Sequence, residues 1–311
     1  MILILGAKGY VGRRFLTYLN ERGLKAVSVS RSDVDYGHTE SLRKLLRDRR
    51  PDFVINAAGF TGKPNVDACE SAKADTLTGN AVLPLRIAEA CAAENVTWGH
   101  ISSGCIYQGN RGLDEDGAPL GFRETDTPNF SFASGHCSFY SGTKALAEQV
   151  LKDAPNLYIW RLRVPFEGRD NPRNYLSKLL NYQRLLDVRN SLSHLDDFVA
   201  SCWATMERRT PFGIYNVTNP GSVTTREVVE MIRAEGERRR KKGDTFSADR
   251  MAKNFDFFES EAEFMQKAAI AHRSSCVLDT TKAEEFKLPL RPVHQALEES
   301  LHNWEWAPSE P

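Results

Sequence analysis

Residues 2–12, which read ILILGAKGYVG, decide the fold of this 311-residue chain. The four apolar residues Ile2–Leu5 predict a short strand that is buried on both faces. The spacing of apolar residues over 10–22 then predicts a helix. Glycines at 6, 9 and 12 allow the backbone between the two elements to turn tightly and to approach a ligand closely. A GxxGxxG pattern between a strand and a helix is typical of a turn that binds a pyrophosphate at the helix N-terminus.

The segment Ser30-Arg31-Ser32 follows the second expected strand, at 25–30. NAD sites tend to carry an acidic residue here, whereas Arg31 can pair with the 2′-phosphate of NADP. Asp33 and Asp35 lie close by, and a solvated surface arginine is the alternative interpretation. We therefore expect NADP (NADPH) as cofactor. The residues expected around it are Gly6, Lys8, Gly9, Tyr10, Val11, Gly12, Ser30, Arg31, Asn56, Ala57, Ala58, Tyr140 and Lys144.

Short apolar runs alternate with helical patterns through the first half of the chain. Strands are expected at 2–5, 25–30, 53–56, 97–102 and 158–164, and helices at 10–22, 40–48, 78–94 and 140–152. This order predicts an α/β fold with a doubly wound parallel sheet, the Rossmann type. The rhythm breaks after Pro165, and a helix is expected at 174–185. We therefore expect an NADP-binding domain at 1–165. Residues 166–311 would form a smaller mixed α/β substrate-binding part, interleaved with late strands of the sheet.

Composition excludes several classes of protein. Lys plus Arg and Asp plus Glu number 41 each, so no field of one sign favours nucleic acid or an anionic membrane. No apolar run approaches the roughly 20 residues of a membrane span, and the N-terminus does not resemble a signal peptide. The six cysteines lack metal-ligand spacing, so we expect free thiols, no metal and a cytoplasmic location. The basic run 238–242 is expected to be solvated.

The pattern Tyr140-Ser-Gly-Thr-Lys144 carries the chemistry. Spacing of i,i+4 on a helix places both side chains on one face, where the ammonium is expected to lower the pKa of the phenol. Such a tyrosine can exchange a proton with the oxygen on a carbonyl carbon. Ser103 follows the fourth expected strand, where it can orient that oxygen. A YxxxK pattern is common by chance, but its order with the glycine motif and Ser103 predicts an oxidoreductase.

With these motifs the chain resembles the extended short-chain dehydrogenases that reduce nucleotide 4-keto-6-deoxyhexoses. It is similar to the 3,5-epimerase/4-reductases of plants and giant viruses, and more distantly to bacterial dTDP-4-dehydrorhamnose reductases. The resemblance covers nearly the whole chain. It is carried by GAKGYVG, NAAGFTGKPNVDACE, SSGCIY, GFRETDTPNF, FYSGTKALAE, RLRVP, NPRNYLSK, GIYNVTNPG and HRSSCVLDTTK.

The resemblance assigns roles to single residues. It implies that Ser103, Tyr140 and Lys144 form the reductase triad. Similar epimerase-reductases, including GDP-fucose synthase, use a cysteine at the position of Cys105 as acid/base, and Lys178 would be its partner. Protons at C3 and C5 are acidified by the C4 ketone, so a thiol and an amine can exchange them. Core packing of Cys105 and a solvated Lys178 are the alternatives.

Other positions are expected to contact the substrate. Arg273 could pair with a diphosphate, and Asn174 and Asn216 could contact the sugar or nucleotide, with structural roles as the alternative. The stretch FASGHC at 132–137 departs from the family pattern and leaves the sugar open. The expected substrate-binding residues are Ser103, Gly104, Cys105, Asn174, Asn216 and Arg273.

The resemblance implies a UDP- or dTDP-4-keto-6-deoxyglucose substrate, reduced at C4 after 3,5-epimerisation to a rhamnose-type donor. A 4-reductase without epimerase activity is one alternative. An NADP-binding regulatory subunit, as known for methionine adenosyltransferase, is another, and an epimerase or dehydratase a third. The sequence allows a homodimer but does not define its interface.

Overall fold

A computed structural model describes residues 1–307 and contains one large parallel sheet. Its strands lie in the order β10-β5-β4-β3-β1-β2, and each adjacent pair runs parallel. The expected doubly wound α/β fold is thus confirmed. The chain adds β2 on one side of β1 and then β3 on the other, so the strand order reverses at β1. Ligands of such sheets bind at the carboxyl ends of the strands near this point. The strand bounds are β1 Ile2–Leu5, β2 Ala26–Val29, β3 Phe53–Asn56, β4 Thr97–Ser103, β5 Leu157–Leu162 and β10 Gly213–Asn216.

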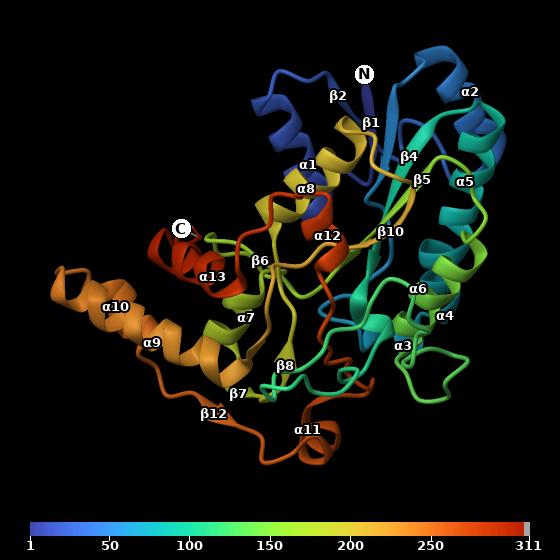
Figure 1. Ribbon diagram of the computed structural model, residues 1–311. Helices are drawn as coiled ribbons and strands as arrows, with labels where there is room; N and C mark the ends of the chain where they lie inside the picture. Colours follow the sequence, from blue (N-terminus) through green and yellow to red (C-terminus); the bar gives the residue numbers. More distant parts are fainter. Residues whose placement is uncertain (308–311) are drawn as a thin grey trace.

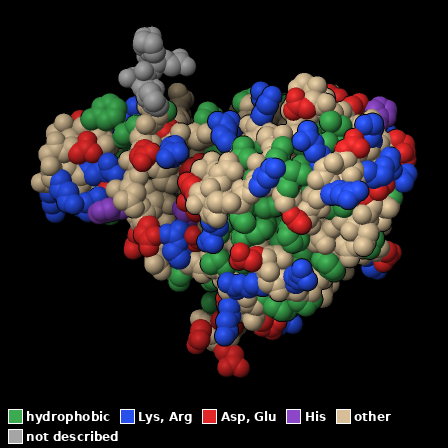
Figure 2. Space-filling view, turned by 90° about the horizontal axis from the view of Figure 1, so that it is seen from above, with side chains coloured by type: hydrophobic (Ala, Val, Ile, Leu, Met, Phe, Trp, Pro, Cys, Tyr) green, Lys and Arg blue, Asp and Glu red, His purple; other side chains and the backbone are tan. Residues whose placement is uncertain are grey.

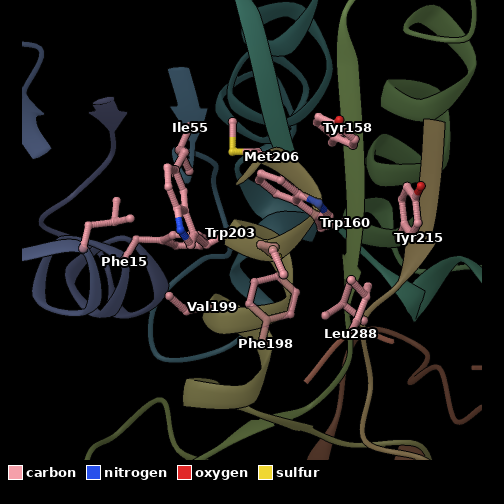
Figure 3. Close-up of a cluster of buried hydrophobic side chains, with 14 of the residues drawn as sticks. Phe15, Ile55, Tyr158, Trp160, Phe198, Val199, Trp203, Met206, Tyr215 and Leu288 are labelled. Carbon is pink, nitrogen blue, oxygen red and sulfur yellow. The ribbon is translucent and has the colours of Figure 1, made fainter. Parts of the chain in front are cut away.

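Helices cover both faces of this sheet, which explains why its strands are apolar on both sides (Figure 1). One face packs against α1 (Tyr10–Glu21), α8 (Leu195–Glu207) and α12 (Thr281–Glu285). The other packs against α2 (Thr39–Arg49), α5 (Leu83–Ala93) and α6 (Phe139–Val150). Figure 3 shows the aromatic core of the first face, in which Phe15, Phe198 and Trp203 gather beside Trp160 of β5.

The chain after residue 165 contributes to the sheet layer and also builds a second core. α8 and β10 return to the sheet, whereas α9 (Thr225–Lys241) and α10 (Thr245–Met251) project away from it (Figure 1). This second core joins α7 (Tyr175–Asn181), α9, α10 and α13 (Val293–His302). The remaining elements are short: α11 Glu261–Ala268, β6 Pro165–Phe166, β7 Arg184–Leu185, β8 Arg189–Asn190, β9 Ser193–His194, β11 Val223–Thr224 and β12 Asp256–Phe257.

Two expected helices differ from those observed. The helix expected at 78–94 begins earlier, with α4 (Lys73–Leu77), and passes through a π-helical turn at Thr78–Val82 before α5. A short helix α3 (Ala68–Ser71) precedes it. The helix expected at 174–185 stops at Asn181, because Arg184–Leu185 pair with β12 as a strand instead.

The surface carries charges of both signs. Figure 2 shows basic and acidic side chains interspersed over the face seen from above. The basic run at 238–242 lies at the exposed end of α9, and Arg238 and Arg239 are paired with Glu235. All six cysteines are free thiols. No helix within residues 1–307 has the length and apolar composition to cross a membrane.

Candidate functional site

A cleft of about 1170 Å³ lies at the carboxyl ends of the sheet strands. One wall comes from the turns after β1 and β3, from the end of β4 and from the start of α6. The opposite wall comes from α7, α11 and the segment 272–274. The two parts of the chain on either side of residue 165 therefore meet across this cleft.

The glycine turn after β1 is shaped by contacts that leave no room for side chains. Gly6 has φ +79°, and a Cβ there would lie 2.6 Å from the Ala58 backbone nitrogen. A Cβ on Gly12 would lie 2.4 Å from the Gly6 carbonyl oxygen. The Gly9 backbone N–H donates to the same oxygen over 3.0 Å, directly before α1 begins. The tight turn thus ends at the N-terminus of α1, whose free N–H groups are the arrangement that binds phosphates.

The expected cofactor residues divide into a cleft lining and its support. Of this set, Gly9, Tyr10, Val11, Ala57, Ala58, Tyr140 and Lys144 line the cleft. Asn56 is fully buried behind it, where its amide oxygen accepts the Ala58 N–H over 3.0 Å. The side chain of Lys8 is exposed beside the turn. The roles of all these residues toward a cofactor stay predictions.

In the loop after β2, Asp33 is bound to the neighbouring Ser30, whereas Arg31 is exposed. The Ser30 hydroxyl donates to the Asp33 carboxylate over 2.6 Å, and the Ser30 N–H donates to the same carboxylate. These bonds lower the pKa of Asp33 below its ordinary value. Arg31 is exposed, so its guanidinium is free to bind an anion at this end of the sheet. Asp33, one of the two aspartates that made the cofactor preference ambiguous in the sequence, is thus bound within its own loop.

The three expected reductase residues come together in the cleft. Ser103 ends β4, and Tyr140 and Lys144 occupy the first two turns of α6, with all three lining the same cavity. Ser138 caps α6 by accepting the Ser141 N–H over 3.1 Å, which fixes the start of the helix. The Lys144 ammonium donates to the Ile101 carbonyl over 2.9 Å.

Burial controls the protonation of this group. Burial, followed by the neighbouring Cys105 and Cys69, raises the pKa of Tyr140 above its ordinary value. The phenol is therefore protonated at neutral pH, the form that a proton donor requires. Burial also lowers the pKa of Lys144. The pKa of Tyr140 is thus raised overall, because desolvation outweighs the opposing Ser103 hydrogen bond and the charge of Arg163. A lowering effect of Lys144 on this pKa stays a prediction.

Cys105 and Lys178 face the same cavity with pKa values shifted in opposite directions. Burial raises the pKa of Cys105, and the Ser103 and Ser141 hydroxyls oppose this rise. Burial lowers the pKa of Lys178, and the positive charge of Arg173 lowers it further. The arrangement suits a thiol that can donate a proton and an amine that can accept one.

The cleft lining is rich in basic side chains although the chain as a whole is neutral, and three of these side chains pair with carboxylates outside the lining, Arg184 and Lys267 with Glu263 and Arg273 with Asp67. Among the described residues, its lining contains no Asp or Glu. The basic side chains are Lys144, Arg163, Arg173, Lys178, Arg184, Lys267 and Arg273. Sequence reasoning did not select Arg163, Arg173, Arg184 or Lys267. Arg163 and Arg173 lie within the quoted RLRVP and NPRN stretches, but Arg184 and Lys267 carry no sequence signal, since only the fold brings them here.

Three expected substrate residues lie outside the cleft lining. Asn174 is fully buried, caps α7 by accepting the Leu176 N–H, and donates to the Glu167 and Arg169 carbonyls. Asn216 is also fully buried and donates to the Phe122 and Asp279 carbonyls. Gly104 lies buried behind the lining. The expected substrate contacts of Asn174 and Asn216 are therefore wrong, because structural bonds occupy both amide groups.

Arg273 does line the cleft, but its guanidinium already has a partner. It forms a two-pronged ion pair with Asp67, with N···O distances of 2.8 and 2.7 Å. Asp67 also accepts the N–H groups of Ile270 and Ala271, so it fastens this segment to the first half of the chain. A contact between Arg273 and a diphosphate stays a prediction.

These features agree with the comparison with known proteins. The RmlD substrate-binding domain profile matches residues 1–305. The chain belongs to this family. It is 33% identical to a bifunctional dTDP-4-dehydrorhamnose 3,5-epimerase/dTDP-4-dehydrorhamnose reductase of Arabidopsis thaliana, over 99% of this chain and 93% of the relative. It is 31% identical to a trifunctional UDP-rhamnose-forming enzyme of the same plant, of whose length it spans 42%. The resemblance expected from the sequence is confirmed.

Solved structures share the fold. The UDP-rhamnose synthase L780 of Acanthamoeba polyphaga mimivirus matches with a TM-score of 0.84 and 24% identity, over 97% of this chain and 98% of that one. The dTDP-4-dehydrorhamnose reductase of Bacillus anthracis, solved in complex with NADP, matches with a TM-score of 0.75 and 18% identity, over 97% of both chains.

Proposed function

We propose that this protein reduces a UDP- or dTDP-4-keto-6-deoxyhexose at C4 with NADPH, after epimerisation at C3 and C5, to give a rhamnose-type sugar donor. The observation that carries the proposal is one cleft lined by Ser103, Tyr140 and Lys144 together with Cys105 and Lys178. Membership of the RmlD family and the likeness to a bifunctional epimerase/reductase support it.

The charge of the cleft supports two anionic ligands. NADPH and a nucleotide sugar each carry a diphosphate, and the cleft lining is basic without an acidic side chain among the described residues. The turn after β1 offers backbone N–H groups to the cofactor pyrophosphate. On the opposite wall Arg173 is suited to the sugar nucleotide, because its guanidinium donates only to the Gly62 carbonyl and has no carboxylate partner among the described residues. Arg184 and Lys267 on the same wall share the carboxylate of Glu263.

The reductase step uses the first wall. NADPH, when bound, supplies the hydride for C4. Ser103 orients the ketone oxygen, and Tyr140 donates its proton to that oxygen as negative charge develops on it. The raised pKa of Tyr140 keeps the proton available before the step. Lys144, one helical turn after Tyr140 on α6, holds the cofactor ribose.

The epimerase step uses both walls. Lys178, whose pKa is lowered, removes a proton from the carbon next to the ketone. Cys105, whose pKa is raised, returns a proton to the opposite face of that carbon. One group on each side of the sugar ring is the geometry that inversion requires.

The test is turnover by a Cys105→Ala variant. With UDP- or dTDP-4-keto-6-deoxyglucose as substrate, the variant is expected to oxidise NADPH at least about 100-fold more slowly than the wild type, since proton transfer contributes factors of this size. With pre-epimerised 4-keto-rhamnose nucleotide, it is expected to keep most of its activity. If the variant matched the wild type on each of the two substrates, the epimerase role of Cys105 would be excluded and a 4-reductase would remain.

We also propose that the protein acts in the cytoplasm as a homodimer. Free thiols are typical of a reducing compartment. The neighbouring helices α4, α5 and α6 expose the apolar side chains of Leu77, Leu85 and Val150. Light scattering coupled to size exclusion checks the dimer, and a mass of 35 kDa would contradict it.

A further inference from the structure

Arg163 is a buried cation that has no acidic partner within residues 1–307. The residue is 6% exposed and lines the floor of the cleft just after β5. Its guanidinium donates to the Asn190 side-chain oxygen and to the Ser274 carbonyl, both neutral groups. Its Nε has no hydrogen-bond partner in the described part of the chain. Arg161, two residues earlier, differs because Glu148 neutralises it at 2.7 Å.

A buried charge of this kind is expensive for the fold. Desolvation of an unpaired ion opposes folding, so a buried charge is usually paired or has a functional counterpart. Arg161 of β5 is neutralised by Glu148 of α6, whereas Arg163, just after the same strand, receives no such carboxylate within the described residues. The structure leaves Arg163 charged at a site where negative charge can arise during a reaction.

The position of Arg163 indicates which group that is. Its Cδ atom lies 3.5 Å from the point where a Cβ on Gly104 would stand. The arginine stem therefore packs against the turn that carries Ser103 on one side and Cys105 on the other. Arg163 is among the positive charges that act on Cys105.

We propose that Arg163 is a positioning residue that stabilises the thiolate of Cys105. The inference rests on the proposed epimerase function. When Cys105 protonates the substrate carbon, the S–H bond breaks, a C–H bond forms, and the electron pair remains on sulfur. The positive charge of Arg163, which lines the same cleft, then stabilises the new anion until the proton is restored.

Other groups around Cys105 do not replace this charge. The hydroxyls of Ser103 and Ser141 offer hydrogen bonds but no charge. Lys144 is the second cation nearby, but burial lowers its pKa. The remaining titratable neighbours are the phenol of Tyr140 and the thiols of Cys137 and Cys276. An arginine stays charged throughout the working pH range, which makes Arg163 the permanent cation.

The experiment measures the ionisation of Cys105 directly in the ligand-free protein. Alkylation by iodoacetamide is followed from pH 7 to 11.5 by peptide-resolved mass spectrometry, so that Cys105 is separated from the other five cysteines. Arg163→Gln removes the charge and retains a hydrogen-bonding amide, whereas Arg163→Lys retains a charge. Arg173→Met is the matched control, since it removes a cleft arginine that faces Lys178.

Arg163→Gln is expected to slow alkylation of Cys105 at pH 8 by about tenfold and to move its midpoint up by about one pH unit. Arg163→Lys and Arg173→Met are expected to stay within about threefold of the wild type. An unchanged midpoint in Arg163→Gln, or an equal shift in Arg173→Met, would overturn the proposal. Circular dichroism verifies that each variant is folded, and Arg163→Met is a second charge-removing variant.

This readout separates the inference from the proposed function. Alkylation needs neither NADPH nor a sugar nucleotide, so a shifted midpoint stands even in a protein without epimerase activity. An unshifted midpoint in a protein that does incorporate deuterium at C3 and C5 contradicts the role of Arg163 alone.

Discussion

The two walls of the cleft are built in different ways. The wall from the first half of the chain carries Ser103, Tyr140 and Lys144 beside a surface of glycines, alanines and backbone N–H groups, held where Gly6, Gly12 and Ala58 pack without room for side chains. The opposite wall consists of long basic side chains from short elements such as α7 and α11. Cofactor binding therefore depends on the path of the backbone, whereas substrate binding depends on charge at the ends of side chains.

The largest effect is expected on the first wall, where Tyr140 meets the substrate. Tyr140→Phe removes the proton donor but keeps the ring, so turnover should fall by roughly 10² to 10⁴ while NADPH affinity stays the same. NADPH absorbance measures turnover, and cofactor fluorescence measures binding. Tyr182→Phe, on the opposite wall, is the control and should keep full activity. Retention of more than about a tenth of the activity by Tyr140→Phe would contradict the assignment.

The next effect separates the walls by chemistry. Lys178→Met should lower deuterium incorporation at C3 and C5 by about 100-fold and leave reduction of pre-epimerised substrate nearly intact. Mass spectrometry of the product in D₂O measures the exchange. Lys267→Met, a second lysine of the same wall, should reduce substrate affinity without abolishing exchange. Similar exchange rates in the two variants would remove Lys178 from the mechanism.

A smaller effect tests the cofactor side. Arg31→Ala should weaken NADPH binding about tenfold and leave NADH binding unchanged, because only NADPH carries the 2′-phosphate that a charge-assisted bond would hold. Titration of both cofactors by fluorescence measures the ratio. Lys25→Ala, at the other end of β2, should change neither affinity. Equal weakening of NADPH and NADH by Arg31→Ala would contradict this role.

The smallest effect concerns an ion pair within the second part of the chain, where Asp197 of α8 meets Arg291. Burial opposes ionisation of Asp197, but hydrogen bonds from His194 and Arg291 lower its pKa from 3.8 to about 2. The charged form thus contributes about 2 kcal/mol above pH 4, and this contribution is lost as the pH falls toward 2. Asp197→Asn should lower the urea-unfolding free energy at pH 7 and converge with the wild type near pH 2. A difference that is constant with pH would exclude the ion pair as its cause.

Sequence reasoning succeeded where local pattern determines structure. Ile2–Leu5, the glycine turn and the pair Tyr140 and Lys144 follow from residue spacing, and they lie on the expected elements. It failed for Asn174 and Asn216, because a buried amide that caps a helix or ties two loops has the same sequence signature as a ligand contact. Nothing local could place Arg184 or Lys267 in the cleft, since only the folding of distant segments brings them there.

The directions in which the pKa values of the site residues shift could not be predicted from the sequence either. The spacing of Tyr140 and Lys144 suggested a lowered phenol pKa, but the extent of burial reverses its direction. Burial likewise shifts Cys105 upward and Lys178 downward, and neither shift can be read from residue types. Desolvation depends on the whole packed environment, so it becomes visible only in the structure.

The most direct test of the proposal that both walls act on one sugar is a single reaction in D₂O. The purified protein is mixed with NADPH and UDP- or dTDP-4-keto-6-deoxyglucose, and the product is analysed by NMR while NADPH absorbance is recorded. We predict NADPH oxidation with deuterium at both C3 and C5 of a 6-deoxyhexose nucleotide. NADPH oxidation without deuterium, or no oxidation until a separate epimerase is added, would contradict the epimerase roles of Cys105 and Lys178.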